Sequence, residues 1–357
     1  MSAQRIAVEP ARDGRAIPVY RALAEVPSGF GPTIAAIGNF DGVHRGHREI
    51  LSAAAEEART AGVQSLAITF DPHPEQFLRP TTAPKLITPL AERLRLLALT
   101  GVDAILVLPF DAALARLSAR EFTRNILMEK LRVRGLHEGQ SFRFGHRAAA
   151  GVKELAEFGA EFGFAVRVHN AVRVHGLEVS SSAVRALIAA GDMRRARWML
   201  GRCFAVLSTP ARGRGIGARL LVPTVNLAPY DGLLPALGVY VTRLKIAGVP
   251  SDRSSSLGWI AGVPSDRSSS LGWIAGRAFQ AVTNVGNRPT FGEASFAIES
   301  HILNFEPLDL DETTPLELEF LLHLRGEREW PSPEALKEQI FKDVARAERY
   351  FRLANAD

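Results

Sequence analysis

Two histidines in a glycine-rich segment have the clearest chemical potential in this chain. They belong to Gly38-Asn-Phe-Asp-Gly-Val-His-Arg-Gly-His47, which lies between an apolar run and a stretch of helical periodicity. The glycines let the backbone turn and approach a phosphate, and the start of the following helix offers free N–H groups and a positive dipole end. His44 and His47 could then direct donors at one oxyanion, which suits attack on the α-phosphate of a nucleoside triphosphate. Zinc is not expected, because two histidines without neighbouring ligands do not complete a coordination shell.

A second segment, Val179-Ser-Ser-Ser-Ala-Val-Arg185, places hydroxyls and an arginine at the start of a predicted helix. Such hydroxyls cap a helix and donate to phosphates, and Arg185 adds a fixed charge. An ordinary N-cap explains the same residues equally well.

The C-terminal half holds a second set of phosphate-binding candidates. Arg212-Gly-Arg-Gly-Ile-Gly217 combines backbone N–H groups with guanidinium charge. Thr224 and Asn226 follow, two positions apart in a predicted strand, so their side chains share one face. A hydroxyl and an amide oxygen are hard ligands that suit Mg²⁺ bound to ATP. Glu299 and His301 also share a strand face.

The elements that position these residues change character along the chain. Short apolar runs alternate with helical stretches in the N-terminal half, which predicts a Rossmann-like α/β domain. The predicted strands are 33–37, 65–69, 104–108 and 165–168, and the predicted helices are 48–60, 90–99, 119–130 and 152–162.

From Phe204 onward, strands separated by Gly/Pro turns predict an antiparallel β-barrel. The predicted strands are 204–207, 238–246, 279–283, 297–305 and 316–324, followed by a C-terminal helix over 333–351 that begins behind Ser332. A helix over 184–200 should join the halves. We therefore expect a Rossmann-like domain over 1–187, a connecting segment over 188–203 and a barrel domain over 204–357.

One segment of the barrel half is duplicated. Residues 247–260, AGVPSDRSSSLGWI, recur unchanged as residues 261–274. Two copies are too few for a solenoid, so the duplicated loop 247–274 is interpreted as a lengthened surface connection between two strands. Doubling a flexible loop costs only about 0.6 kcal/mol of closure entropy.

Composition limits the class of protein. Of the 43 basic residues 37 are Arg, the side chain suited to gripping phosphate. Eight Arg and one acidic residue between Arg185 and Arg219 would also fit a nucleic-acid footprint, but aromatic residues are scarce there. Cys203 is the single cysteine, so an internal disulfide is excluded. No apolar run approaches the roughly 20 residues of a membrane span, and the first thirty residues hold no apolar core of a signal peptide. We expect a cytoplasmic protein.

Taken together in order, these motifs are specific. The segments 36–47, Thr69-Phe-Asp-Pro-His-Pro74, Phe142-Arg-Phe-Gly145, 179–185, 223–226, 234–240, 284–291, 299–301 and 324–327 resemble the bifunctional riboflavin kinase/FMN adenylyltransferase (FAD synthetase) family of bacteria. The resemblance extends from about Gly31 to the C-terminus.

The resemblance implies a role for each matching residue. Glu299 would be the base that deprotonates the riboflavin 5′-hydroxyl, and His44 and His47 the pair that acts in adenylyl transfer. Thr224 and Asn226 would hold Mg²⁺. ATP would contact Gly38, Phe40, Asp41, Gly46, Ser181, Ser182 and Arg185 in one half and Arg212, Gly213, Arg214 and Gly217 in the other. The flavin would contact Phe70, Asp71, Pro72, His73, Phe142, Arg143, Phe144, Asn284 and Arg288.

The implied activities are phosphorylation of riboflavin to FMN and adenylylation of FMN to FAD, with ATP as co-substrate and ADP and pyrophosphate as products. Ser141 stands where the family usually has an acidic or amide residue, which leaves open a kinase whose N-terminal half only binds nucleotide. A non-catalytic flavin-binding or RNA-associated protein is a third reading, and RNA binding would weaken steeply with salt. No nucleic-acid or membrane partner is expected, and an oligomer is compatible with the sequence.

Overall fold

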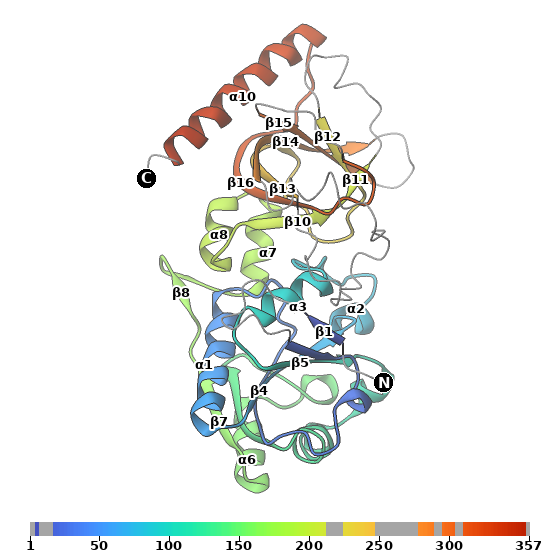
Figure 1. Cartoon of the computed structure of the whole chain (residues 1–357), viewed down its shortest axis with the longest axis vertical. Helices are drawn as coiled ribbons and strands as arrows, with labels where there is room; N and C mark the ends of the chain where they lie inside the picture. Colours follow the sequence, from blue (N-terminus) through green and yellow to red (C-terminus); the bar gives the residue numbers. More distant parts are fainter. Residues whose placement is uncertain are drawn as a thin grey trace. The chain divides into compact units, whose positions relative to one another are not determined.

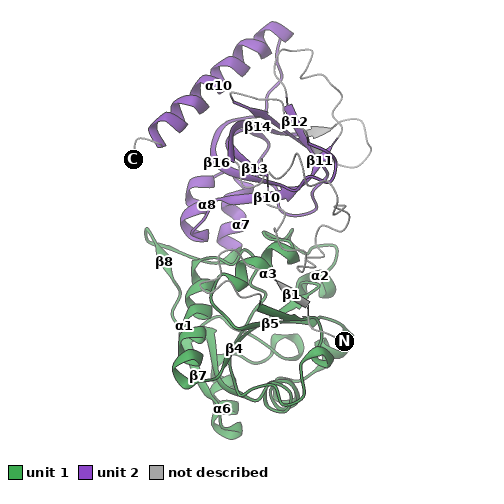
Figure 2. Ribbon diagram, in the orientation of Figure 1, with its two compact units in different colours: residues 1–181, 254–257 green, residues 182–253, 258–357 purple. Residues whose placement is uncertain are grey.

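The computed structural model describes residues 4–6, 17–211, 224–246, 278–288, 295–303 and 310–354. The described residues form two compact units that divide between Ser181 and Ser182 (Figure 2). Our sequence limits for the domains stay predictions, and the duplicated loop 247–274 lies outside the described residues.

The first unit is built on a sheet of order β1-β2-β5-β4-β3-β6-β7 (Figure 1). All neighbours are parallel except β1, which runs antiparallel to β2. The strands are β1 (Gln4–Ile6), β2 (Ile17–Tyr20), β3 (Thr33–Ile37), β4 (Gln64–Asp71), β5 (Ala104–Pro109), β6 (Val133–Gly139) and β7 (Ala165–His169), with β8 (Arg173–Val174) and β9 (Leu177–Glu178) as a separate hairpin.

Helices cover both faces of this sheet. The face that presents Ala36 and Ala67 packs on α1 (Arg45–Ala61) and α3 (Leu90–Ala98). The opposite face, with Ala35 and Leu66, packs on α6 (Val152–Phe162) and a π-helix, η2 (Phe122–Met128). The short helices are α2 (Pro74–Leu78), α4 (Ala112–Arg116) and α5 (Ala119–Glu121), with 3₁₀ turns at Leu23–Glu25 and His146–Ala148.

The order in which the strands follow one another across the sheet reverses at β3. From β3 the sheet grows through β4 and β5 on one side and through β6 and β7 on the other. Open parallel sheets bind ligands at such a switch point, outside the carboxyl ends of the strands. The glycine-rich segment 38–47 leaves β3 at that end.

The second unit is an antiparallel sheet of order β10-β16-β13-β14-β15-β12-β11. Its strands are β10 (Phe204–Ser208), β11 (Pro210–Ala211), β12 (Thr224–Leu227), β13 (Gly238–Ile246), β14 (Ala278–Arg288), β15 (Ser295–Ile302) and β16 (Leu316–Gly326). β10 and β11 are separated only by Thr209 yet lie at opposite edges. A single residue can connect strands at opposite edges only if the sheet curls round until its two edges meet. The predicted combination of a Rossmann-like domain and a barrel domain is confirmed.

The last helix, α10 (Pro333–Ala354), packs on one face of the curled sheet. Ala347 and Phe351 join Val239, Val241 and Val282 in one apolar cluster. The other face carries a buried ladder of hydroxyls, in which Thr283 Oγ1 lies 2.6 Å from Thr242 Oγ1 and 2.8 Å from Ser300 Oγ.

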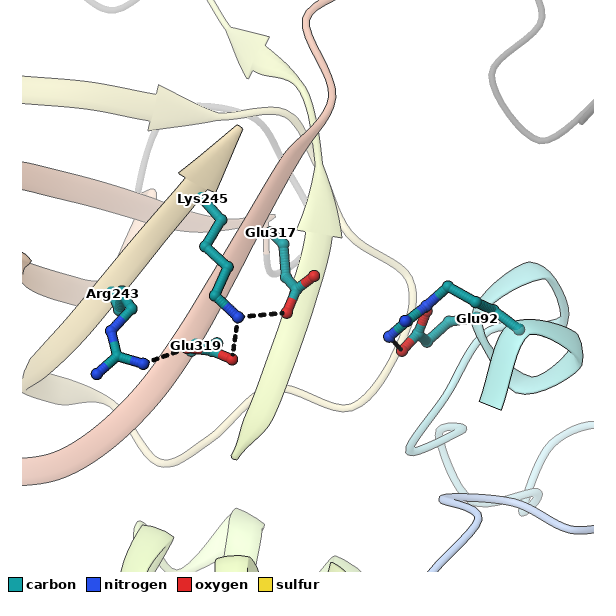
Figure 3. A network of polar contacts seen from close by, with 6 residues as sticks. Glu92, Arg243, Lys245, Glu317 and Glu319 are labelled. Atoms are coloured by element: carbon teal, nitrogen blue, oxygen red, sulfur yellow. Dashed lines mark hydrogen bonds and ion pairs between the residues drawn. The ribbon is translucent and has the colours of Figure 1, made fainter. Parts of the chain in front are cut away.

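A polar network crosses β13 and β16 near one end of this sheet (Figure 3). Lys245 Nζ lies 2.5 Å from Glu319 Oε1 and 3.5 Å from Glu317 Oε1, and Arg243 Nη1 lies 3.4 Å from Glu319 Oε2. Opposite charges facing each other across strands help to fix the register of the pair.

Several elements differ from the sequence prediction. The single helix expected over 184–200 is two helices, α7 (Ser181–Ala189) and α8 (Met193–Leu200). Gly191, with φ of 78°, breaks the helix, and the Asp192 side chain caps α8 by accepting from Arg195 N. β6 was missed, because Arg134, Gly135 and His137 interrupt its apolar pattern.

None of the helices in the described ranges combines the length and apolar character that crossing a bilayer would demand.

Candidate functional sites

The segment that follows β3 is held in a strained backbone conformation. Phe40 and Val43 have φ of 48° and 37°, in the left-handed region, which is costly for a β-branched residue such as Val43. Gly42 has φ of 84°, and a Cβ there would lie 3.2 Å from the Ile87 side chain. Strain of this kind persists only where surrounding contacts determine the conformation.

Asp41 supplies many of those contacts. Its buried carboxylate accepts hydrogen bonds from Ile87 N at 3.1 Å and Thr88 N at 3.0 Å. Gly42 N donates to Thr88 Oγ1 at 3.0 Å. Asp41 was predicted to contact ATP, but its side chain is directed at the segment before α3, so it shapes the loop. Sequence reasoning did not identify Thr88, whose position before the Pro89 helix start was the available signal.

The two histidines lie together at the start of α1. His44 is the N-cap residue, and its Nδ1 accepts from His47 N at 3.3 Å. The imidazole rings are stacked with centroids 3.6 Å apart, and Phe40 meets the His47 ring edge-on at 5.2 Å. Because His44 Nδ1 is an acceptor, the neutral ring carries its proton on Nε2.

His47 is a neutral donor at physiological pH. Burial, and secondarily the neighbouring His44, lower the pKa of His47 well below its usual value. A neutral imidazole keeps one N–H and can donate to a phosphate without a full charge. The pair therefore offers polarised donors at the α1 N-terminus, the positive end of the helix dipole.

The third member of this site is Ser181, at the start of α7. Its Oγ donates to Asp41 O at 2.8 Å, which joins the two transferase motifs. Ser182 is exposed and Arg185 half-buried on the same helix. Both belong to the second unit, so their position relative to the His44–His47 loop is not described.

The predicted flavin-binding residues of the first unit occupy two loops. Phe70, at the end of β4, meets Phe110 edge-on at 5.8 Å, and Asp71–Pro72 is a cis peptide bond. His73 is the N-cap of α2 and accepts from Glu75 N at 3.1 Å through Nδ1.

In the loop after β6, the side chains differ in burial. Phe144 is buried against Phe122, whereas Phe142 is half-buried and stacks on Phe144 at 5.3 Å. Arg143 donates to Ala148 O and Ala149 O, so its guanidinium braces the loop. Phe142 is therefore the more available of the two rings for a ligand.

In the second unit three predicted residues stand in one row across three strands. Glu299 of β15 is directly opposite Asn226 of β12 on one side and Asn284 of β14 on the other. Residues opposite each other in antiparallel strands project to the same face. Thr224 is opposite His301 in the next row of that face. Glu299 is exposed, and Thr224 and Asn226 are half-buried.

A second carboxylate lies beside this row. A Cβ on Gly286 would lie 2.9 Å from Glu327 Oε1 and 3.1 Å from Asn284 Nδ2, so both side chains border this glycine. Arg325 Nε donates to the buried Asp343 at 2.8 Å and so holds α10 against β16.

Five predicted positions cannot be placed in this site. Arg212, Gly213, Arg214 and Gly217 lie outside the described residues, and Arg288 is described only as the last residue of β14.

Comparison with known proteins finds relatives for both units. The family model for FAD synthetase matches residues 28–183, and the model for riboflavin kinase matches residues 200–351. A bifunctional riboflavin kinase/FMN adenylyltransferase of Pseudomonas fluorescens is 35% identical over 315 residues, which cover 88% of this chain and 91% of the relative. The protein of the same description from Escherichia coli K12 is 31% identical, over 89% of this chain and 92% of the relative.

A solved structure shares the fold. The crystal structure described as a macrolide-efflux protein from Streptococcus pneumoniae superposes with a TM-score of 0.75 at 22% identity and covers 92% of this chain and 98% of that one. At this identity the likeness concerns the fold alone.

Proposed function

This chain belongs to the family of bifunctional riboflavin kinase/FMN adenylyltransferases, and we propose that its two activities divide between the two units. The chain phosphorylates riboflavin to FMN and adenylylates FMN to FAD with release of pyrophosphate. The match of residues 28–183 to FAD synthetase favours both activities over a kinase alone. The observation that carries the division is that each unit holds its own set of phosphate-directed groups: the histidine loop in the first and the Asn–Glu–Asn row in the second.

In the first unit an FMN phosphate oxygen attacks the α-phosphorus of ATP. The new P–O bond forms as the bond from the α-phosphorus to the bridging oxygen breaks, and pyrophosphate leaves. His44 Nε2–H and the neutral His47 donate to phosphate oxygens whose charge grows in the transition state. The strained loop and the α1 N-terminus hold these donors in place, so the acceleration comes from positioning and electrostatics. Gly38, Gly46 and Ser181 are the further ATP contacts proposed in this unit, and Ser182 and Arg185 are assigned to ATP on the resemblance alone.

The FMN ring is assigned to the aromatic side of the same unit. One wall lies at the end of β4 and consists of Phe70, Asp71, Pro72 and His73. The other lies after β6 and runs from Phe142 to Phe144. Half-buried aromatic side chains such as Phe70 and Phe142 suit a planar ring system.

In the second unit the riboflavin 5′-hydroxyl attacks the γ-phosphorus of ATP, and ADP leaves. Glu299 accepts the hydroxyl proton, and Asn284 orients the carboxylate from the neighbouring strand. Thr224 and Asn226 would hold Mg²⁺, and two hard oxygen donors leave room for ATP phosphates in its coordination shell. When bound, Mg²⁺ neutralises charge on the transferred phosphoryl group. Arg288 and the segment of Arg212, Gly213, Arg214 and Gly217 are assigned to flavin and nucleotide contacts on the resemblance alone.

The substrates and the single cysteine support the cytoplasm as the compartment. No nucleic acid or membrane is assigned as a partner, and oligomeric state is left to measurement.

Two single substitutions test the division of labour. Glu299→Gln should lower riboflavin phosphorylation at least about 100-fold, the usual contribution of a general base, and leave FMN adenylylation unchanged. His47→Ala should do the reverse. Chromatography of riboflavin, FMN and FAD over time, with ATP and Mg²⁺ present and with FMN supplied directly in a second series, separates the two steps.

The wild-type protein is the control. FMN that appears before FAD supports two working sites, whereas FMN without FAD would leave a kinase alone. Loss of both activities in either variant, with the melting temperature unchanged, would contradict the division.

A further inference from the structure

Arg93 of α3 is a fully buried arginine that the proposed chemistry leaves without a role. Burial of an unpaired guanidinium is expensive, and an apolar side chain would pack this helix position at lower cost. Its neighbour Arg95 shows the usual alternative, because its side chain stays partly exposed and pairs with Glu92 at 2.7 Å. The position of Arg93 therefore calls for a specific reason.

The contacts of Arg93 connect two loops. Nη1 donates to Asn39 O in the nucleotide loop at 2.9 Å, and Nη2 donates to Phe70 O in the flavin loop at 2.9 Å. Thr69 Oγ1 also donates to Asn39 O at 3.2 Å. One rigid, planar group thus sets the distance between the backbone that precedes His44 and the backbone that precedes Asp71.

The charge of Arg93 is retained in this setting. Burial lowers the pKa of Arg93, and the carboxylates of Asp41 and Asp71 act in the opposite direction. Because the ordinary pKa of an arginine lies far above neutral pH, the group stays cationic there.

We propose that Arg93 is the positioning residue that sets the distance between the ATP loop and the FMN loop for adenylyl transfer. This inference rests on the proposed function of the first unit. In-line attack requires the reacting atoms within a few tenths of an ångström of their productive separation, and a displacement of about 1 Å costs on the order of 100-fold in rate. Arg93 touches neither substrate, so its effect reaches the reaction only through the Asn39 and Phe70 carbonyls.

The test compares Arg93→Met and Arg93→Lys with wild type and with the control Arg95→Met. Steady-state FMN adenylylation is measured with FMN and ATP varied in turn, and riboflavin phosphorylation is measured on the same samples. Arg93→Met should lower the adenylylation kcat about 100-fold with both KM values within about threefold. Arg93→Lys keeps the charge but cannot span both carbonyls, so an intermediate loss of about tenfold is expected. Arg95→Met should match wild type, and kinase activity should be unchanged throughout.

Calorimetric melting of each full-length variant shows whether a loss of adenylylation comes from unfolding or from a change in positioning. If Arg93→Met does not fold, Arg93→Lys carries the test alone. An adenylylation kcat within threefold of wild type in the folded variants would overturn the proposal, as would a loss confined to KM. Wild-type protein that makes no FAD from supplied FMN would instead overturn the proposed function.

Discussion

Glu138 is a buried carboxyl group at the carboxyl end of β6, beside the nucleotide loop. Its Oε1 accepts from Ile37 N at 2.7 Å, where the pairing of β3 with β6 ends. Burial raises the pKa of Glu138 well above its usual value, and the hydrogen bond from Ile37 only partly opposes this. The native state therefore prefers the protonated carboxyl over a wider pH range than the unfolded chain does.

The raised pKa of Glu138 makes the free energy of unfolding fall as the pH rises. Between the unfolded pKa of about 4.3 and the raised native pKa, the native state binds more protons than the unfolded state. The stability contributed by Glu138 is therefore fully present below this window and is lost as pH rises through it. Glu138→Gln retains the acceptor for Ile37 N without the ionisation, so its melting temperature should exceed that of wild type by a margin that grows from pH 5 to pH 8. Each unit of pKa shift corresponds to about 1.4 kcal/mol.

Differential scanning calorimetry at the two pH values measures this margin. Glu161→Gln, at an exposed carboxylate of α6, is the control and should give the same small difference at both pH values. A constant margin for Glu138→Gln would show that the carboxyl is ionised in the native state at pH 5 already.

For single residues, the sequence identifies those that belong to a motif more readily than those that do not. His44, His47 and Glu299 could be found because glycine spacing and strand alternation surround them. Arg93 could have been noticed, since it falls on the stripe of Leu90, Leu94 and Leu97. Glu138 could not, because its burial depends on β3 as a neighbour, which is a contact between distant parts of the chain.

Helices and strands match their predicted bounds where the pattern of apolar residues is regular. The strand Thr33–Ile37 and the helix Val152–Phe162 have the bounds that a short apolar run and helical spacing indicate. The helix expected over 119–130 instead continues from α5 as the π-helix η2, a change of hydrogen-bond register that no side-chain pattern specifies. The hairpin of β13 and β14 pairs Lys245 with Ala278, so the two strands are in register up to the residues that flank the duplicated segment.

One buried ion pair, beside the apolar cluster, helps to hold α10 on the curled sheet. Asp343 is buried and accepts from Arg325 Nε at 2.8 Å and from Gln339 Nε2 at 2.9 Å. Asp343→Ala leaves the Arg325 guanidinium without this carboxylate, and removal of one partner of a buried pair costs about 3–5 kcal/mol. We expect about 3 kcal/mol here, because the Arg325 side chain keeps 19% exposure.

Urea unfolding followed by tryptophan fluorescence measures this loss, since all four tryptophans lie after Ser182 in the sequence. Lys342→Ala removes an exposed pair with Glu338 on the same helix and should cost less than about 1 kcal/mol. If the two variants lose equal stability, the buried pair does not hold α10.

At the scale of the whole molecule, the two proposed sites lie in different units, and each is assigned its own ATP-binding residues. FMN made by the second unit must therefore reach the first. We expect release into solution and recapture, which makes the flux from riboflavin to FAD depend on the concentration of free FMN. Sequence patterns predicted both units because each has its own local pattern, but they carry no information on transfer between sites.

Mixing the two single-site variants tests this expectation directly. Glu299→Gln protein retains adenylylation and His47→Ala protein retains phosphorylation, so neither alone should convert riboflavin to FAD. Together they should make FAD after a lag, and the lag should lengthen when both proteins are diluted, because FMN must accumulate near the KM of the adenylylating site before it is used. Wild-type protein at equal active-site concentration should show the same lag. A lag in the mixture, beside wild-type protein that makes FAD without a lag, would mean that FMN passes between the units of one chain without release.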